Sequence, residues 1–241
     1  MSRHEIEMVD VLGQPMEVFV FRPSTQTTCP GIVLAQHIPV GHTGIENDEF
    51  TLVTAQRLCD AGFAVAIPFI FHWWEKNEGI VVKRDAARDD WMVADCQAAF
   101  DLLAADPMVD KDRIGVVGHC WGGRVAWLFA CHNSRLAACA VFYGGRVMIP
   151  MGATNKAPIE LTHQIGCKVA GFFGNDDTNP TPADVDDYEL AMRAGGVECE
   201  FHRYDGARHA FQNFPSPEHY HEQASEDAWG KLLDFLSREL G

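Results

Sequence analysis

The chain has 241 residues, of which 47% are hydrophobic and 22% are charged, and its formal net charge at pH 7 is −15. This composition is that of an ordinary globular protein with enough apolar residues for a continuous core. The negative charge disfavours nucleic acid and anionic membranes as partners, because Lys and Arg supply most of the binding to both. We therefore expect a small molecule as the partner.

Eight cysteines are spread along the chain, and no two of them are spaced as C-x-x-C. Most lie in apolar stretches, which indicates reduced, buried thiols rather than a disulfide framework. The N-terminal residues lack the apolar segment of a signal peptide, and no apolar run is long enough to span a membrane. These patterns predict a cytoplasmic protein and leave the oligomeric state open between monomer and dimer.

The N-terminal part of the chain predicts a hairpin followed by alternating strands and helices. Residues 5–22 alternate around a central turn and are typical of a β-hairpin. Short apolar runs at 31–35 and 63–67 predict buried strands. Between them, 50–61 has helical spacing and stops at Gly62, a residue typical of helix ends.

The pattern continues to the C-terminus. Residues 69–83 match no regular pattern, whereas 84–104 predict one long amphipathic helix. Further strands are expected at 113–117, 137–142, 168–173 and 198–204, and further helices at 124–130, 182–194 and 222–240. Short buried strands alternating with helices predict an α/β fold, with a mostly parallel central sheet flanked by helices on both faces. No linker is visible, so we expect residues 1–241 to form a single domain.

A cysteine lies at the junction of a predicted strand and helix, within the segment 118–123, Gly-His-Cys-Trp-Gly-Gly. The segment has the pattern G-x-C-x-G, the nucleophile elbow with sulfur in place of the serine hydroxyl. Its glycines allow strand and helix to pass close together at a sharp turn. Unpaired N–H groups at the helix N-terminus favour an anion there. The pattern predicts that Cys120 is a nucleophile, with a buried, inert thiol as the alternative.

A catalytic cysteine needs a base, and the base needs an acid that orients it. Asp176 and Asp177 follow one predicted strand, and His209 lies in the loop after the last one, which is the order acid then histidine found in elbow hydrolases. Carboxyl ends of parallel strands meet at one edge of the sheet, so Cys120, one aspartate and His209 are expected to converge there. Strand geometry alone does not choose between the two aspartates.

Two other histidines, His219 and His221, have a spacing that could suggest metal ligands. No third ligand follows them at a usual distance along the chain. We therefore expect no metal and no other cofactor.

These segments together resemble the dienelactone hydrolase family, the cysteine hydrolases of the α/β-hydrolase fold. The similarity covers most of the chain, from residue 31 through the segment 207–211, and is most specific at the elbow and at a Gly-x-x-Asp segment that starts at Gly174. The resemblance implies that Asp177 is the acid and that His209 is the base. It also implies a fold of the α/β-hydrolase type.

The resemblance further implies an oxyanion hole made by two backbone N–H groups, those of Ile38 and Trp121. Family members that act on dienelactones carry a glutamate at the position of His37, where it handles the thiol proton before substrate arrives. His37 could hydrogen-bond the thiol or could merely line the pocket.

The family's two carboxylate-binding arginines are also missing, since Trp73 and Asn213 stand at their positions. A pocket with tryptophans at this place favours a bulkier and less charged acyl or lactone substrate, although ordinary core packing is the alternative for these rings. The arginines that could replace the missing pair are Arg124, Arg146 and Arg208.

The sequence thus predicts a cofactor-independent hydrolase of a lactone or carboxylic ester. It would act through Cys120, His209 and Asp177 and a thioester intermediate, on a substrate other than a simple dienelactone. One alternative is a thioesterase or acyl-transfer enzyme that uses the same three residues. A second is a ligand-binding relative without turnover, and a redox sensor is disfavoured because no resolving cysteine is adjacent.

Overall fold

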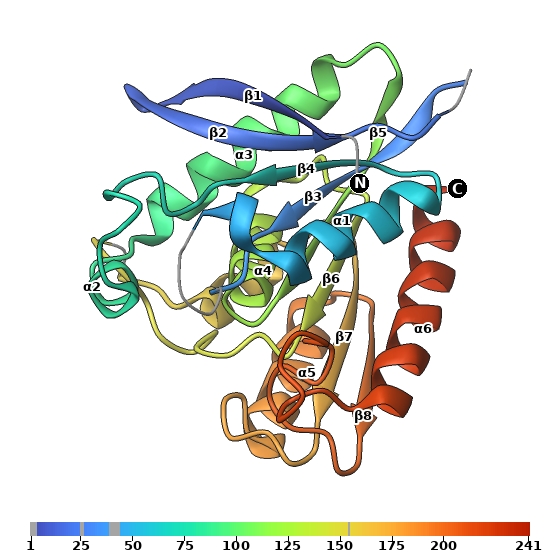
Figure 1. The fold of residues 1–241 in the computed structure, drawn as a ribbon. Helices are drawn as coiled ribbons and strands as arrows, with labels where there is room; N and C mark the ends of the chain where they lie inside the picture. Colours follow the sequence, from blue (N-terminus) through green and yellow to red (C-terminus); the bar gives the residue numbers. More distant parts are fainter. Residues whose placement is uncertain (1–3, 25–26, 39–43, 154) are drawn as a thin grey trace.

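The described residues form an eight-stranded sheet in the order β1-β2-β4-β3-β5-β6-β7-β8 (Figure 1). The computed structural model describes residues 4–24, 27–38, 44–153 and 155–241. The strands are β1 (His4–Val11), β2 (Gln14–Phe21), β3 (Cys29–Ala35), β4 (Ala64–Pro68), β5 (Val109–His119), β6 (Ala138–Phe142), β7 (Lys168–Gly174) and β8 (Cys199–Tyr204). Only the β1–β2 and β2–β4 pairs of these strands are antiparallel. The predicted α/β fold, with an N-terminal hairpin and a mostly parallel sheet, is confirmed.

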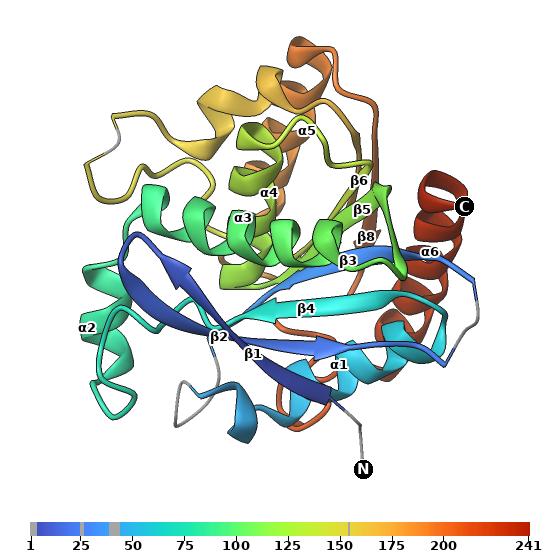
Figure 2. The same ribbon diagram turned by 90° about the horizontal axis from the view of Figure 1, so that it is seen from above.

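Helices cover both faces of this sheet, as Figure 2 shows from above. The helices are α1 (Glu49–Asp60), α2 (Ile80–Asp85), α3 (Asp89–Ala105), α4 (Trp121–His132), α5 (Pro182–Gly195) and α6 (Glu222–Leu240), with short 3-10 helices η1 (Ile45–Asn47) and η2 (Pro158–Gln164). α1 and α6 share one face, where the Arg57 guanidinium lies 4.0 Å from the ring centre of Trp229. The opposite face carries α3, α4 and α5. Within the described ranges, no helix is both long and apolar enough to cross a bilayer.

The long helix expected over 84–104 is wrong at its N-terminal end. The structure has two helices instead, because α2 ends at Asp85 and α3 begins at Asp89. Arg88 between them is extended, and the Asp89 carboxylate is held by the Arg124 guanidinium of α4. This contact with a residue distant in sequence fixes the start of α3, although the apolar periodicity of 84–104 is continuous.

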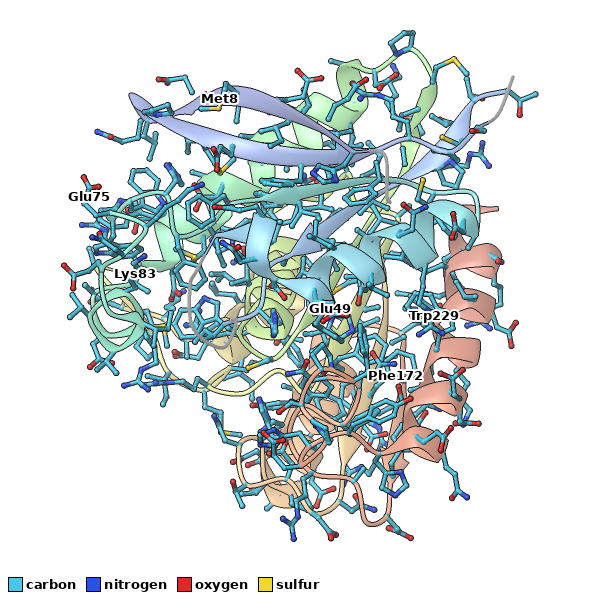
Figure 3. The ribbon with its side chains drawn as sticks, viewed as in Figure 1. Met8, Glu49, Glu75, Lys83, Phe172 and Trp229 are labelled. Atoms are coloured by element: carbon cyan, nitrogen blue, oxygen red, sulfur yellow. The ribbon has the colours of Figure 1, made fainter. Side chains whose placement is uncertain are left out.

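The apolar core fills both sides of the central strands. Each residue of β4 and of β6 is buried, as expected for strands covered on two faces. Figure 3 shows Phe172 of β7 and Trp229 of α6 in the interior, whereas Met8 of the edge strand β1 lies at the surface. The sheet is therefore a rigid support at its centre, where β3, β5 and β6 lie side by side.

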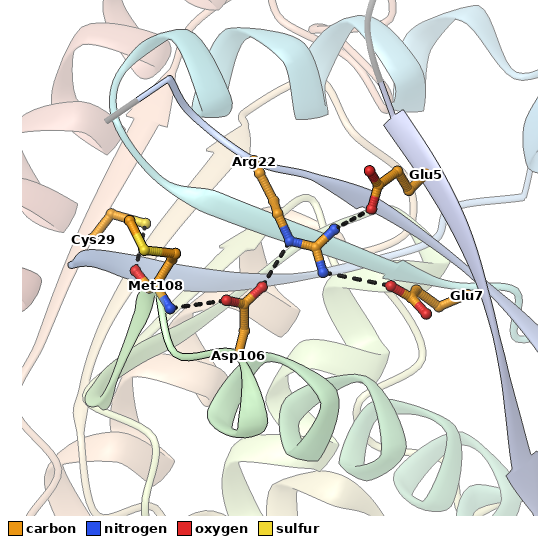
Figure 4. Close-up of polar contacts among 6 residues, drawn as sticks. All are labelled: Glu5, Glu7, Arg22, Cys29, Asp106 and Met108. Carbon is orange, nitrogen blue, oxygen red and sulfur yellow. Dashed lines mark hydrogen bonds and ion pairs between the residues drawn. The ribbon is translucent and has the colours of Figure 1, made fainter. Parts of the chain in front are cut away.

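In addition to the pairing of β2 with β4, Arg22 links the hairpin to the turn after α3 (Figure 4). The Arg22 guanidinium bonds Glu5 and Glu7 of β1, and its Nε donates to Asp106 Oδ2 at 2.7 Å, just after α3. Asp106 Oδ1 in turn accepts the Met108 N–H. These contacts connect the sheet edge with the turn that leads into β5, far from the elbow at the other end of that strand.

Candidate active site

The elbow places Cys120 between β5 and α4 in a backbone conformation that few residues other than glycine adopt, with φ +55° and ψ −119°. The turn is closed by direct backbone contacts. A Cβ on Gly118 would lie 1.9 Å from the Gly122 carbonyl oxygen, and a Cβ on Gly122 would lie 2.1 Å from that of Ala35. The glycines are therefore required for the turn that presents the sulfur at the sheet edge.

The structure brings the sulfur together with a histidine and an aspartate from two other loops. His209 Nε2 lies 3.1 Å from Cys120 Sγ, and His209 Nδ1 lies 2.9 Å from Asp177 Oδ2. The other Asp177 oxygen accepts the Asn179 N–H at 2.8 Å. Asp176 instead uses its backbone N–H to bond the carbonyl of Ala207. The contact to the imidazole thus belongs to Asp177.

Electrostatics at this site favour the protonated imidazole. Burial lowers the pKa of His209, but its hydrogen bonds and charge interactions with Asp177 and Cys120 outweigh burial and raise it to about 10. The Asp177 carboxylate accepts the Nδ1 proton, which leaves Nε2 directed at sulfur. The arrangement can therefore hold a protonated imidazole between the Asp177 carboxylate and the sulfur.

The expected oxyanion donors lie at the same edge of the sheet. Trp121 is the first residue of α4, so its backbone N–H is among the donors that a helix leaves unpaired at its start. Ile38 follows β3, which pairs in parallel with β5 so that Ala35 stands opposite Gly118. Gly122 packs on the Ala35 and Gln36 carbonyls. The segment that leads to Ile38 therefore passes directly beside the elbow.

Comparison with known proteins agrees with this architecture. The sequence profile of the dienelactone hydrolase family matches residues 16–240. The chain belongs to the dienelactone hydrolase family. A relative from Salmonella typhimurium, named for carboxymethylenebutenolidase activity, is 28% identical over 95% of this chain and 85% of its own. A relative from Escherichia coli with the same name is 30% identical over 95% of this chain and 84% of its own.

Solved structures show the same fold. A dienelactone hydrolase structure from Klebsiella pneumoniae superposes with a TM-score of 0.82 at 24% identity, covering 98% of this chain and 99% of that one. A dienelactone hydrolase-like promiscuous phosphotriesterase from metagenomic libraries also superposes with a TM-score of 0.82, at 19% identity and 99% coverage of both chains. At these identities the likeness establishes the fold alone.

His37, which the resemblance places at the position of the family glutamate, contacts Asp48 and Phe50. Its Nε2 lies 3.1 Å from Asp48 Oδ1, and its ring centre lies 5.0 Å from that of Phe50. His37 and Asn213 line one cavity of about 300 Å³ together with Asp48 and Phe50. Two of the three expected substrate contacts thus share a cavity.

The third, Trp73, lies in a different place. Its indole N–H donates to Asp95 Oδ2 at 3.0 Å, and its ring stacks on Trp91 with centres 4.5 Å apart. Asp95 is buried and also bonds His72 Nε2 at 2.9 Å. Trp73 is therefore fixed to α3, and it borders a cavity that includes Trp74 and Lys76 rather than His37.

Of the three arginines considered as ligands of a substrate carboxylate, Arg124 already binds groups of the protein itself. It is fully buried, and it makes two bonds to Asp89 and two to the carbonyls of Arg146 and Ile149. Arg146 is half-buried with φ +57°, and Arg208 is exposed. Neither forms an ion pair with another described residue.

The two histidines with metal-like spacing have local partners. His219 Nδ1 lies 2.9 Å from Ser216 Oγ, and His221 Nδ1 accepts the Ala224 N–H at the start of α6. Among the described residues, no group of three His, Cys, Asp or Glu side chains is arranged to hold a metal ion.

Sequence reasoning missed two residues of this region. Tyr143, with φ +37°, follows β6 and places its buried ring 5.3 Å from that of His209. The sequence marks Asp48 as a loop carboxylate without assigning it a role, whereas the structure shows that it caps α1 and contacts His37. Each had a local signal: a residue just after a buried strand, and an Asp three residues before Thr51 at a helix start.

Proposed function

We propose that this dienelactone hydrolase family member hydrolyses a lactone or carboxylic ester, with Cys120 as nucleophile, His209 as base and Asp177 as the residue that orients the imidazole. The observation that carries the proposal is the continuous contact from Cys120 Sγ through His209 to Asp177 at 3.1 and 2.9 Å. The names of the relatives support ester or lactone chemistry. No cofactor takes part in the proposed reaction.

In the proposed reaction the Cys120 thiolate attacks the carbonyl carbon, and the oxyanion is held by the backbone N–H groups of Ile38 and Trp121. Collapse of this intermediate breaks the ester C–O bond, and the leaving oxygen takes the proton from the His209 imidazolium. A thioester remains on sulfur. Water then attacks the thioester while His209 accepts its proton, so the acid is released and the thiolate–imidazolium pair is restored.

The substrate we propose is not a simple dienelactone. Trp73 and Asn213 replace the arginines implied by the resemblance, and the buried Arg124 is held by Asp89. Neither Trp73 nor Asn213 brings a positive charge of its own to a substrate carboxylate. A bulkier and less charged acyl group fits the residues better, and we expect a small molecule of this kind.

A panel of lactones, aryl esters and thioesters tests the proposal. We expect turnover of at least one lactone or aryl ester, and its loss in Cys120→Ala, with only a trace kept by Cys120→Ser because a hydroxyl needs stronger base assistance. Turnover of thioesters alone would favour the thioesterase alternative. A protein that is acylated but never releases the acyl group would instead be a binding relative.

We also propose that the protein works in the cytoplasm. The support is its eight cysteines, all of which are free thiols in the structure. Disulfide-free chains rich in buried thiols are typical of reducing compartments. Fractionation of cells that express the protein tests this location.

A further inference from the structure

The geometry points to His37 and Asp48 as positioning residues that hold the Ile38 amide beside Cys120, rather than as groups that act on the thiol. This inference rests on the proposed function, because it assigns how one oxyanion donor is kept in place. His37 is the residue directly before Ile38.

The first step is the location of the segment. Gly122 of the elbow is in contact with the carbonyls of Ala35 and Gln36, the two residues before His37. The β3 end and the first turn of α4 are therefore fixed to one another. Beyond this contact the chain leaves the sheet, so a further anchor is needed to define where the Ile38 N–H lies.

The second step is the anchor itself. His37 and Asp48 are 6% and 4% exposed, and His37 Nε2 lies 3.1 and 3.0 Å from the two carboxylate oxygens of Asp48. Asp48 is in turn fixed as the N-cap of α1, since it accepts the Thr51 N–H at 3.2 Å and the Thr51 hydroxyl at 2.6 Å. Phe50 packs on the His37 ring. His37 is thus tied to the start of a rigid helix.

The third step is the charge of the anchor. Burial raises the pKa of Asp48, but its bonds to His37 and Thr51 outweigh burial and lower the pKa below its ordinary value. His119, whose ring meets the edge of Phe50, has its pKa lowered by burial to about 3 and is neutral. An ionised Asp48 therefore faces His37, and a charge-assisted bond of this kind restrains the ring strongly.

A positioning role predicts a specific effect on the kinetic constants kcat and KM. An oxyanion donor acts on the transition state, so its displacement lowers kcat and leaves KM nearly unchanged. Alkylation of Cys120 by iodoacetamide forms no oxyanion, so its rate should not depend on the anchor. A group that activated the thiol would instead change the alkylation rate.

The test compares His37→Ala, His37→Gln and Asp48→Ala with wild type, using an aryl ester and iodoacetamide. Loss of one whole donor costs roughly 100- to 1,000-fold in kcat, so we expect His37→Ala to lower kcat about 10- to 100-fold. KM and the alkylation rate should change less than about threefold. His37→Gln should recover most of kcat, because the glutamine Nε2–H can still donate to Asp48.

Asp48→Ala should lower kcat by a similar factor, and the double variant His37→Ala/Asp48→Ala should be no slower than the worse single one. His132→Ala is the control, since this exposed histidine bonds the Leu128 carbonyl of its own helix, and its kcat should equal wild type. Unchanged kcat in His37→Ala, or a tenfold lower alkylation rate, would overturn the positioning role while ester hydrolysis by wild type stands. Absence of any turnover by wild type would overturn the proposed function as well.

Discussion

At the scale of single residues, Cys120 combines an unusual backbone conformation with a side chain that contacts His209. Its φ of +55° belongs to a turn that Gly118 and Gly122 close by direct backbone contacts. The sulfur then meets a histidine whose other nitrogen is held by a buried aspartate. Such preorganisation means that little movement is needed before attack on a carbonyl.

The raised pKa of His209 predicts how folding stability changes with pH. The folded-state value of about 10 lies above the ordinary 6.5 of an unfolded histidine. The stabilisation is therefore fully present below about pH 6.5 and is lost as pH rises through about 10. In urea unfolding, the free-energy difference between wild type and His209→Gln should be largest at low pH and shrink towards pH 10. A difference that grows with pH would contradict the assignment.

The buried Arg124–Asp89 pair predicts a large stability effect. Arg124→Met should lower the free energy of unfolding by about 3–5 kcal/mol, because the buried Asp89 carboxylate would lose its two bonds to the guanidinium. Arg238→Met is the control, since Arg238 bonds glutamates at the surface and should cost less than about 1 kcal/mol. Equal effects of the two variants in urea unfolding would show that the pair has no such role.

At the scale of elements, the strand–turn–helix at the elbow was predictable because its glycines and apolar runs are adjacent in sequence. The division between α2 and α3 was not predictable, because the bond that starts α3 comes from Arg124 on another helix. The contact between His37 and Asp48 was missed for the same reason. Its two partners are eleven residues apart, and the packing of a loop against α1 brings them together.

Close packing between β3 and α4 predicts the effect of adding one methyl group. Gly122→Ala would place its Cβ 2.1 Å from the backbone oxygen of Ala35, which cannot move without separating the strand from the helix. We expect a loss of more than about 2 kcal/mol in unfolding free energy and a large loss of turnover. Gly230→Ala in α6 has open space around its Cβ and should stabilise by about 0.5–1 kcal/mol. A tolerated Gly122→Ala in thermal unfolding would show that the elbow is looser than described.

At the scale of the whole molecule, one sheet and one apolar cluster connect the hairpin at β1 with the last helix, α6. The fold class and the family could be predicted because hydrophobic periodicity and the elbow pattern extend over most of the chain. The choice between Asp176 and Asp177 could not be derived from geometry alone, since both lie in the same turn. The burial of Arg124 in the core could not be predicted either, because an arginine near a loop is usually exposed.

The continuous cluster leads us to propose that residues 1–241 unfold as one domain. Tryptophans lie in both halves of the chain, from Trp73 to Trp229, so fluorescence reports on the whole molecule. Fluorescence and far-UV circular dichroism should give coincident transitions in urea. Two separated transitions would show independent domains.

The central claim is that Cys120 carries an acyl group during turnover, and rapid-quench mass spectrometry tests it most directly. Wild type mixed with an aryl ester should gain the mass of one acyl group within the first turnover. Peptide mapping should place this mass on Cys120, and hydroxylamine should remove it. Cys120→Ala should gain no mass and show no turnover. Hydrolysis by Cys120→Ala at the wild-type rate, or an acyl group found on another residue, would contradict the account.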